Sequence, residues 1–300
     1  MPTNQSTADS RPRIGLIAGW GRYPFQIARG LEESGYDVYC VGIAGHVDRT
    51  IARYCSKFQL TPLTKMRQQV RFFQQNGIES VTMAGKIHKV LFFQRKFWRN
   101  NIPDWTCVKT FFPHFITGKK NRSDDTLLTA VVDGFAKHGI TMTAATDLIP
   151  EILVQEGQLC GSRLSHREKL DIEYGWKLAK EMGRLDIGQS IAVKGQAVLA
   201  VEAVEGTDQC IRRAGLLCSK GGFTVVKVAK PQQDMRFDVP TIGVGTIQTM
   251  VQSGGKLLAI EADRTVIVDE SQVVRFATQN GIKVVAIRDG VVTESLAGVA

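Results

Sequence analysis

Residues 13–45 read RIGLIAGWGRYPFQIARGLEESGYDVYCVGIAG, and this stretch decides the fold class. RIGLIAG is an apolar run with the length of a buried strand. FQIARGLEESG has the apolar spacing of a helix that ends at Gly35, and DVYCVGIAG has the pattern of a second strand. A strand, a helix and a second strand in this order are typical of a βαβ unit with parallel strands.

The same alternation continues through the first half of the chain. QLTPLTKMRQQVRFFQQNGI (59–78) predicts a helix with Thr61 as its cap, Pro62 at its first position and Gly77 past its end. SVTMAGKI then predicts a third strand and SDDTLLTAVVDGFAKHG a further helix, while ITMTAATDLIPEIL completes the half as a strand followed by the exit from the domain. Strands that alternate with helices predict an α/β fold, here a Rossmann-like parallel sheet with helices on both faces.

A second domain is predicted beyond residues 155–165, where QEGQLCGSRLS has the composition of turns. After it come a helix, a hairpin with its turn at 194–196, and short strands interleaved with helices. We therefore expect a disordered tail at 1–12, an N-terminal α/β domain at 13–155 and a C-terminal mixed α+β domain at 160–300.

Composition and charge narrow the classes of protein. The 300 residues are 43% hydrophobic, which is ample for a buried core, and they carry a formal charge of +9. This charge indicates an anionic partner, which nucleic acid, a membrane surface or a phosphorylated small molecule would satisfy. The polar start MPTNQSTADSR lacks a signal-peptide core, and no later stretch has the ~18 apolar residues of a membrane span. We therefore expect a cytoplasmic protein.

The residue types also bear on the choice of metal. The six cysteines form no CxxC pair and the five histidines form no HxH or HExxH motif, which argues against a zinc site. A hard ion such as Mg²⁺, held by carboxylates and by substrate phosphates, fits the composition better. Asp124 and Asp125 either stabilise a helix start as first-turn acids or face a phosphate through Mg²⁺, and their spacing does not decide.

Residues 88–122 interrupt the alternation with many aromatic side chains among lysines and arginines. One interpretation is an irregular helical insertion whose aromatics pack on the sheet. A second is a basic, apolar surface that contacts acyl chains or anionic headgroups. Stacking on nucleic acid is a third, although no recognition module surrounds the segment.

Two glycine turns follow predicted strands in the first half. Gly19 and Gly21 stand where the first strand turns into a helix that begins after Arg22, and Gly85 and Lys86 follow the third strand. Glycine at such a turn lets backbone N–H groups approach a phosphate, and ligands of open parallel sheets bind at the carboxyl ends of the strands. The spacing is GxG without a third glycine, so a tight turn alone explains the first loop equally well.

A dense polar motif, EGTDQCIRRAG, begins at Glu205 after an alternating strand. A helix that starts near Thr207 would direct backbone donors at an anion, and Arg212 or Arg213 could reach a phosphate while the other faces solvent. The acids Glu202 and Glu205 are costly beside an anion unless they bind a cation or orient an arginine. A solvated helix face is the alternative.

The second dense motif is KVAKPQQDMRFDVPTIGVGTI (227–247). Lys227 and Lys230 could neutralise phosphate charge, and Asp238 before Val-Pro could bind a metal ion or activate water, which are the needs of phosphoryl transfer. A solvent-facing strand edge would give the same alternation.

Together, IGLIAGWGRYP, SDDTLL, EMGRLDIGQ, AVEGTDQCIRRAG and KVAKPQQDMRFDVPTIGVGTI resemble the LpxI family, the UDP-2,3-diacylglucosamine pyrophosphatases of lipid A biosynthesis. The resemblance covers roughly residues 13–290. It implies two domains with the lipid product between them. It also implies Mg²⁺-dependent hydrolysis of UDP-2,3-diacylglucosamine to UMP and 2,3-diacylglucosamine 1-phosphate, called lipid X.

The resemblance also assigns residues by motif. The family's essential acid in DLPTIG matches Asp238 in DVPTIG, its EGTD turn matches residues 205–208, and its glycine loop matches residues 19–22. This chain departs from the family in two places. The family's glycine loop reads GGG, and Trp20 replaces its middle glycine here. Arg122 and Ser123 stand before the paired aspartates, where the family has Lys-Gly. These departures affect the expected sugar or acyl contacts more than the chemistry.

The interpretation is therefore a Mg²⁺-dependent pyrophosphatase, with Mn²⁺ as an alternative ion, that acts on a UDP-linked glycolipid as a peripheral protein at the cytoplasmic face of the inner membrane. The oligomeric state is left open, a homodimer included. We expect catalysis by Asp238, Lys230 and Asp208; substrate binding by Gly19, Gly21, Arg22, Gly85, Thr207, Arg212, Arg213, Lys227 and Thr241; and metal binding by Asp238, Asp124, Asp125 and Glu205. The rival hypotheses are a non-catalytic nucleotide-binding regulator and a nucleic-acid binder that uses the basic aromatic segment.

Overall fold

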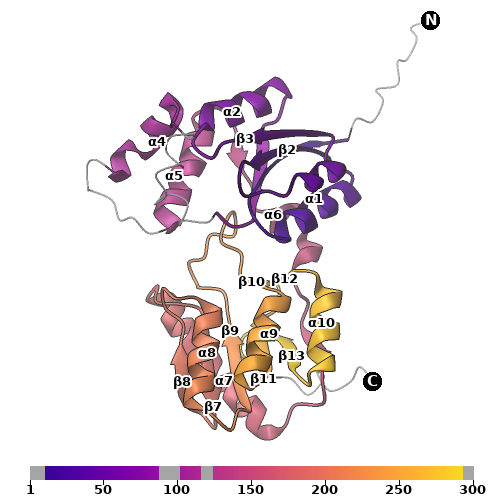
Figure 1. Cartoon of the computed structure of the whole chain (residues 1–300), viewed down its shortest axis with the longest axis vertical. Coiled ribbons are helices and arrows are strands. Elements are labelled where there is room, and N and C mark those ends of the chain that lie inside the picture. The colour runs from indigo at the N-terminus through magenta and orange to yellow at the C-terminus, as the bar shows by residue number, and fades with distance from the viewer. Residues whose placement is uncertain (1–10, 88–101, 116–123, 293–300) are drawn as a thin grey trace, which may run out of the picture. The chain divides into compact units, whose positions relative to one another are not determined.

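A computed structural model describes residues 11–87, 102–115 and 124–292, with the side chains of 111–115 and 124–127 left undescribed. The chain divides into two compact units (Figure 1). Unit 1 comprises Met1–Pro150 and Met235–Phe237, and unit 2 comprises Glu151–Asp234 and Asp238–Ala300.

Unit 1 is built on a parallel sheet of five strands in the order β3-β2-β1-β4-β5. The strands are β1 (Arg13–Ala18), β2 (Asp37–Ile43), β3 (Lys57–Thr61), β4 (Ser80–Ala84) and β5 (Thr141–Met142). The connecting helices are α1 (Tyr23–Glu33), α2 (Met66–Gln75), α4 (Trp105–Phe115), α5 (Asp124–Ala136) and α6 (Ala145–Leu148), with short 3₁₀ turns at Arg49–Tyr54 and Pro150–Ile152. The α/β fold predicted from the first stretch is confirmed.

The core of unit 1 explains why its strands are continuous apolar runs. In β1 every residue after Arg13 is buried, as expected of a parallel strand that is covered on both faces. Phe73 of α2 and Phe135 of α5 pack against this sheet in one apolar cluster, while α1 buries Ile27 and Leu31.

Unit 2 is built on a mixed sheet of six strands in the order β6-β13-β11-β9-β7-β8. The strands β13, β11 and β9 are parallel, and β6, β7 and β8 are added antiparallel. The bounds are β6 (Gly157–Cys160), β7 (Ser190–Lys194), β8 (Ala197–Val201), β9 (Phe223–Lys227), β11 (Gly255–Glu261) and β13 (Lys283–Ile287), with a separate pair of β10 (Thr241–Ile242) and β12 (Val266–Ile267).

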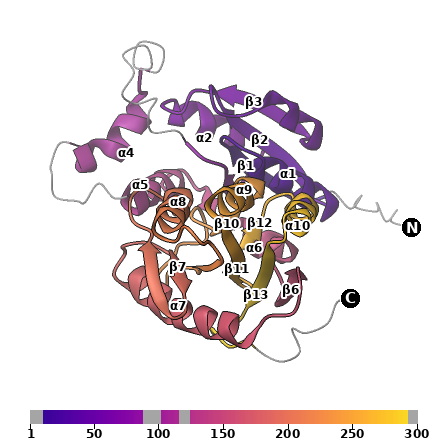
Figure 2. The same cartoon turned by 60° about the horizontal axis from the view of Figure 1, so that its bottom comes forward.

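Helices cover both faces of the second sheet. The helices α8 (Thr207–Leu217), α9 (Val244–Ser253) and α10 (Glu270–Gln279) pack in one apolar cluster, and α7 (His166–Arg184) packs in another (Figure 2). Successive residues of β9 alternate between them, because Val225 belongs to the first cluster and Val226 to the second. This alternation makes unit 2 a three-layer mixed domain.

Local signals in the sequence set two features of unit 2. Helix α7 begins with a capping box, in which the Ser165 hydroxyl accepts from the Glu168 N–H at 3.3 Å and the Ser165 N–H donates to the Glu168 carboxylate at 2.7 Å. The predicted hairpin turn is confirmed, with positive φ at Gly195 and Gln196 as a type I′ turn requires. The Asp171 carboxylate accepts both of their N–H groups.

Two expectations about the elements need correction. Residues 59–61 do not open a helix, because they form the end of β3 and pair with β2, so α2 begins only at Met66. The stretch 155–165 is not all turn, because β6 within it pairs antiparallel with β13. The division between the two units follows Pro150. Most of segment 88–122 lies outside the described residues, and helix α4 is the part of this segment that the structure describes as a regular element.

Candidate active site

The two glycine loops of unit 1 meet at one edge of its sheet. Strands β1 and β4 are neighbours, and the chain continues from β1 to β2 on one side and from β4 to β5 on the other. Open α/β sheets bind ligands at such a reversal of strand order. The Gly19 N–H donates to the Ala84 carbonyl at 2.8 Å, and Trp20 and Lys86 exchange two backbone hydrogen bonds of 2.9 Å. The sequence prediction that the two loops converge therefore holds.

The same hydrogen bonds change how this loop could bind an anion. The N–H groups of Gly19 and Trp20 are used within the protein, and a Cβ at Gly19 would lie 2.9 Å from the Lys86 carbonyl oxygen. Gly19 is thus needed for close packing of two loops. Gly21, with φ of +107°, and Arg22 follow it at the start of α1. The Arg22 guanidinium lies over the Phe25 ring, 5.4 Å from its centre.

In unit 2 a single hydroxyl joins several predicted site residues. Thr207, the first residue of α8, donates from its hydroxyl to the Glu202 carboxylate at 3.1 Å. The Lys227 ammonium donates to the Thr207 hydroxyl oxygen at 3.1 Å, and the Ser190 hydroxyl lies 3.2 Å from that oxygen. Lys227 also donates to the Thr241 carbonyl at 3.1 Å. The structure therefore brings Thr207, Lys227 and Thr241 together.

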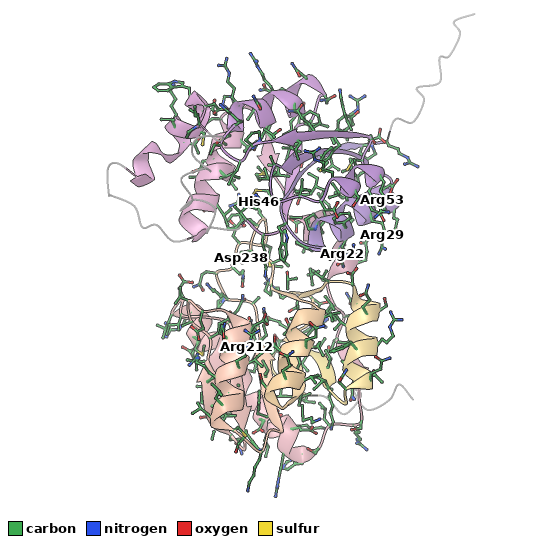
Figure 3. The ribbon with its side chains drawn as sticks, in the orientation of Figure 1. Arg22, Arg29, His46, Arg53, Arg212 and Asp238 are labelled. Atoms are coloured by element: carbon green, nitrogen blue, oxygen red, sulfur yellow. The ribbon has the colours of Figure 1, made fainter. Side chains whose placement is uncertain are left out.

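The two adjacent arginines of the motif differ in their surroundings. Arg213 donates to the Val201 carbonyl and to the Glu205 carboxylate. The Glu205 carboxyl accepts a hydrogen bond from the backbone N–H of Glu205 and another from Arg213, and these bonds hold its pKa below the usual value. Arg212 comes from the same helix, α8 (Figure 3). It is exposed, and within the described ranges it makes no such bond. Glu205 thus orients Arg213, and the two neighbouring arginines have different surroundings.

Asp238 is held by a chain of hydrogen bonds from Lys230. The Lys230 N–H donates to the Gln233 side-chain oxygen at 2.8 Å, and the Gln233 amide donates to Asp238 Oδ2 at 2.7 Å. The Asp238 N–H also donates to the Asp234 carbonyl at 3.0 Å, which closes a tight turn. The Lys230 ammonium pairs with Asp186 at 2.6 Å. The carboxylate of Asp238 is therefore fixed in direction, while the Lys230 charge is shared with another acid.

The remaining predicted residues fall into two groups. Asp208 is an exposed first-turn acid of α8. Asp124 and Asp125 open α5, but their side chains lie outside the described part of the chain, as does Ser123. Among the described residues, no three or more His, Cys, Asp or Glu side chains gather as a metal-binding group.

Sequence reasoning missed Ser190, Gln233 and the hydrogen-bond partner of Glu202. Ser190 lies outside the dense motifs, and Gln233 lies within the motif at 227–247 but was not singled out there. Both gain their partners only through folding. Glu202 was noted as a costly acid, but its bond to Thr207 depends on where α8 begins relative to the end of β8. The one signal for it is the spacing from Glu202 to Thr207, which brings the first turn of a helix back over the strand end.

Comparisons with known proteins identify relatives of the whole chain. A curated relative, UDP-2,3-diacylglucosamine pyrophosphatase LpxI of Caulobacter vibrioides, is 29% identical over 282 residues, which are 92% of this chain and 97% of the relative. A solved biotin carboxylase domain of the Hydrogenobacter thermophilus 2-oxoglutarate carboxylase covers 71% of this chain and 42% of its own. Its 8% identity and TM-score of 0.25 carry no argument about fold or function.

The family assignment covers both units. The LpxI N-terminal domain matches residues 13–152, and the LpxI C-terminal domain matches residues 155–285. The dense motifs at 205–215 and 227–247 fall within the second match. The chain therefore belongs to the LpxI family.

Proposed function

We propose that this protein is a hydrolase that cleaves the diphosphate of UDP-2,3-diacylglucosamine, releasing UMP and 2,3-diacylglucosamine 1-phosphate for lipid A biosynthesis. The observation that carries the proposal is the continuous match of both LpxI domains, together with a curated relative of that activity aligned over nearly its whole length. The arrangement of cations and acids in unit 2 supports the same reaction class.

The described side chains suit the separate needs of diphosphate hydrolysis. Lys227 supplies a positive charge whose direction is fixed by Thr207 and by the Thr241 carbonyl, as stabilisation of developing phosphate charge requires. Arg212 is free of ion pairs within the described ranges and can add a bidentate contact to a phosphate. Asp238, fixed by Gln233, orients a water molecule or accepts its proton.

Mg²⁺ is the metal that we propose for this site. Magnesium in phosphoryl-transfer enzymes is commonly held by one or two carboxylates and by substrate phosphates, so the single fixed carboxylate of Asp238 fits that donor set. Glu205 fits less well than the sequence suggested, because Arg213 occupies its carboxylate. When bound, the ion would neutralise phosphate charge, with Mn²⁺ as a substitute.

We further propose that the protein works at the cytoplasmic face of the inner membrane as a peripheral protein. The acyl chains of the proposed substrate reside in a bilayer, and the chain's formal charge of +9 favours an anionic membrane surface. No helix among the described residues is long and apolar enough to cross a bilayer.

The test is to incubate the purified full-length protein with UDP-2,3-diacylglucosamine and Mg²⁺ and to quantify UMP and the lipid monophosphate. Equal amounts of both products are expected, and water labelled with ¹⁸O identifies the phosphorus that is attacked. If UDP-sugar lipids bind without cleavage, the protein is a nucleotide-binding regulator. Binding to DNA or RNA with a steep salt dependence and no response to UDP-lipids would favour a nucleic-acid binder.

A further inference from the structure

A row of three polar side chains lies across the edge of the sheet in unit 2. Strand β7 pairs with both neighbours, so that Ser190 stands opposite Lys227 of β9, and the Glu202 N–H donates to the Ser190 carbonyl at 2.8 Å on the other side. Residues directly opposite each other on neighbouring strands point to the same face. The register therefore places Lys227, Ser190 and Glu202 side by side, and Thr207 of α8 lies over the row.

The hydrogen bonds of the Thr207 hydroxyl have only one consistent arrangement. A carboxylate can only accept and an ammonium can only donate, so the single Thr207 proton goes to Glu202 and its oxygen accepts from Lys227. Ser190 then donates to the second lone pair. All three hydrogen-bonding positions of this hydroxyl are filled, so the hydroxyl connects an acid to a cation and has no position left for a substrate.

Burial makes the charge of Glu202 significant. Glu202 and Lys227 are each 7% exposed, and the second carboxylate oxygen of Glu202, Oε2, is buried with no hydrogen-bond partner among the described residues. A buried carboxylate is costly unless an opposite charge compensates it, and the same holds for a buried ammonium. The Thr207 hydroxyl links the two buried charges by hydrogen bonds to both, and it fixes the direction of the Lys227 ammonium.

We propose that Glu202 is a positioning residue, which acts through the Thr207 hydroxyl to hold the Lys227 ammonium charged and correctly directed. The kinetic part of this inference rests on the proposed hydrolase activity. Because Lys227 would act on charge that develops during the reaction, loss of its positioning should lower kcat more than it changes KM.

The test is a double-mutant cycle with Glu202→Gln and Thr207→Val, with Thr207→Ser as the conservative variant. The two single variants should each lower kcat about tenfold with KM changed less than about threefold, while Thr207→Ser keeps kcat within about threefold. The double variant should be no slower than the slower single variant, because both changes break one chain. Glu181→Gln, which alters an exposed acid paired with Arg184, is the matched control and should leave kcat unchanged.

A measurement without substrate separates this inference from the proposed function. The ammonium of Lys227 is buried and hydrogen-bonded, so its ¹H–¹⁵N NMR signal should be observable in the wild type and in Thr207→Ser, with Lys227→Arg for assignment. The signal should shift or vanish in Glu202→Gln. If it does so in a protein that cleaves no UDP-lipid, the proposed function fails and the positioning role stands. An unchanged signal, or multiplicative losses of kcat in the double variant, would overturn the inference.

Discussion

Replacing Gly85 by alanine should destabilise unit 1 through the contact between its two glycine loops. Gly85 follows β4 with φ of +96°, a conformation that side chains rarely adopt. An added Cβ would lie 2.7 Å from Cγ of Pro24 and 2.9 Å from both the Gly19 carbonyl carbon and the Trp20 carbonyl oxygen. Two of these three atoms are backbone, so the neighbours cannot simply rotate away.

The expected loss combines two effects. A left-handed conformation costs an L-residue about 1–2 kcal/mol, and forcing an extra carbon into a packed region costs about 1–3 kcal/mol more. Gly35→Ala is the matched control, because Gly35 has a similar φ of +86° and an added Cβ there would meet nothing within 4 Å. Gly35→Ala should therefore show the first cost alone.

Equilibrium unfolding in urea, followed by circular dichroism, measures both variants. Gly85→Ala should lower the free energy of unfolding by about 1–3 kcal/mol more than Gly35→Ala does, with little change in the m-value. Because Gly85 contacts the loop at residues 19–20, its alanine variant should also weaken substrate binding. Equal losses in the two variants would refute the argument that Gly85 is required for loop packing.

Three further predictions concern stability, pH and metal. Glu261→Gln should lower the free energy of unfolding, measured by urea titration, by about 3 kcal/mol. The change leaves the half-buried Lys180 ammonium without the carboxylate that this ammonium contacts at 2.7 Å, and an unchanged free energy of unfolding would contradict the prediction. Burial raises the pKa of Glu168, but hydrogen bonds from Ser165 and Lys283 outweigh burial and hold this pKa below its usual value. The ionised Glu168 therefore stabilises the fold above about pH 4.3, and this stabilisation is lost as pH falls through the folded-state pKa. The stability difference between wild type and Glu168→Gln should therefore shrink between pH 7 and strong acid, and a constant difference would contradict the linkage. EDTA should abolish UMP release and Mg²⁺ or Mn²⁺ should restore it, whereas full turnover in metal-free buffer would remove the metal from the proposal.

The parts of the fold that sequence could predict are those with strong local patterns. The strand-helix-strand unit at 13–45, helix α7 with its Ser165 cap, and the turn at Gly195 each depend on residues close together in the chain. Strands β3 and β6 were missed because both are short and partly polar. They are strands only because they pair with β2 and β13, which lie elsewhere in the sequence.

In the candidate site, too, local patterns could be predicted from the sequence, whereas contacts between distant segments could not. The motifs marked Thr207 and Lys227 as site residues, because polar and charged side chains are dense there. Their connection through one hydroxyl depends on the register of β7 with β8 and β9, which no local pattern encodes. The difference between Arg212 and Arg213 likewise required the folded position of Glu205.

The most direct test of the central claim is single-turnover release of UMP from UDP-2,3-diacylglucosamine by Asp238→Ala, with Asp238→Asn beside it to retain an acceptor for Gln233. The proposed role of Asp238 in orienting water or binding Mg²⁺ predicts a loss of about 10²-fold or more in both variants. Uncleaved UDP-lipid should still bind and be detectable by mass spectrometry of the purified variants, because Lys227 and Arg212 remain. Release of UMP at the wild-type rate by Asp238→Ala would contradict the account.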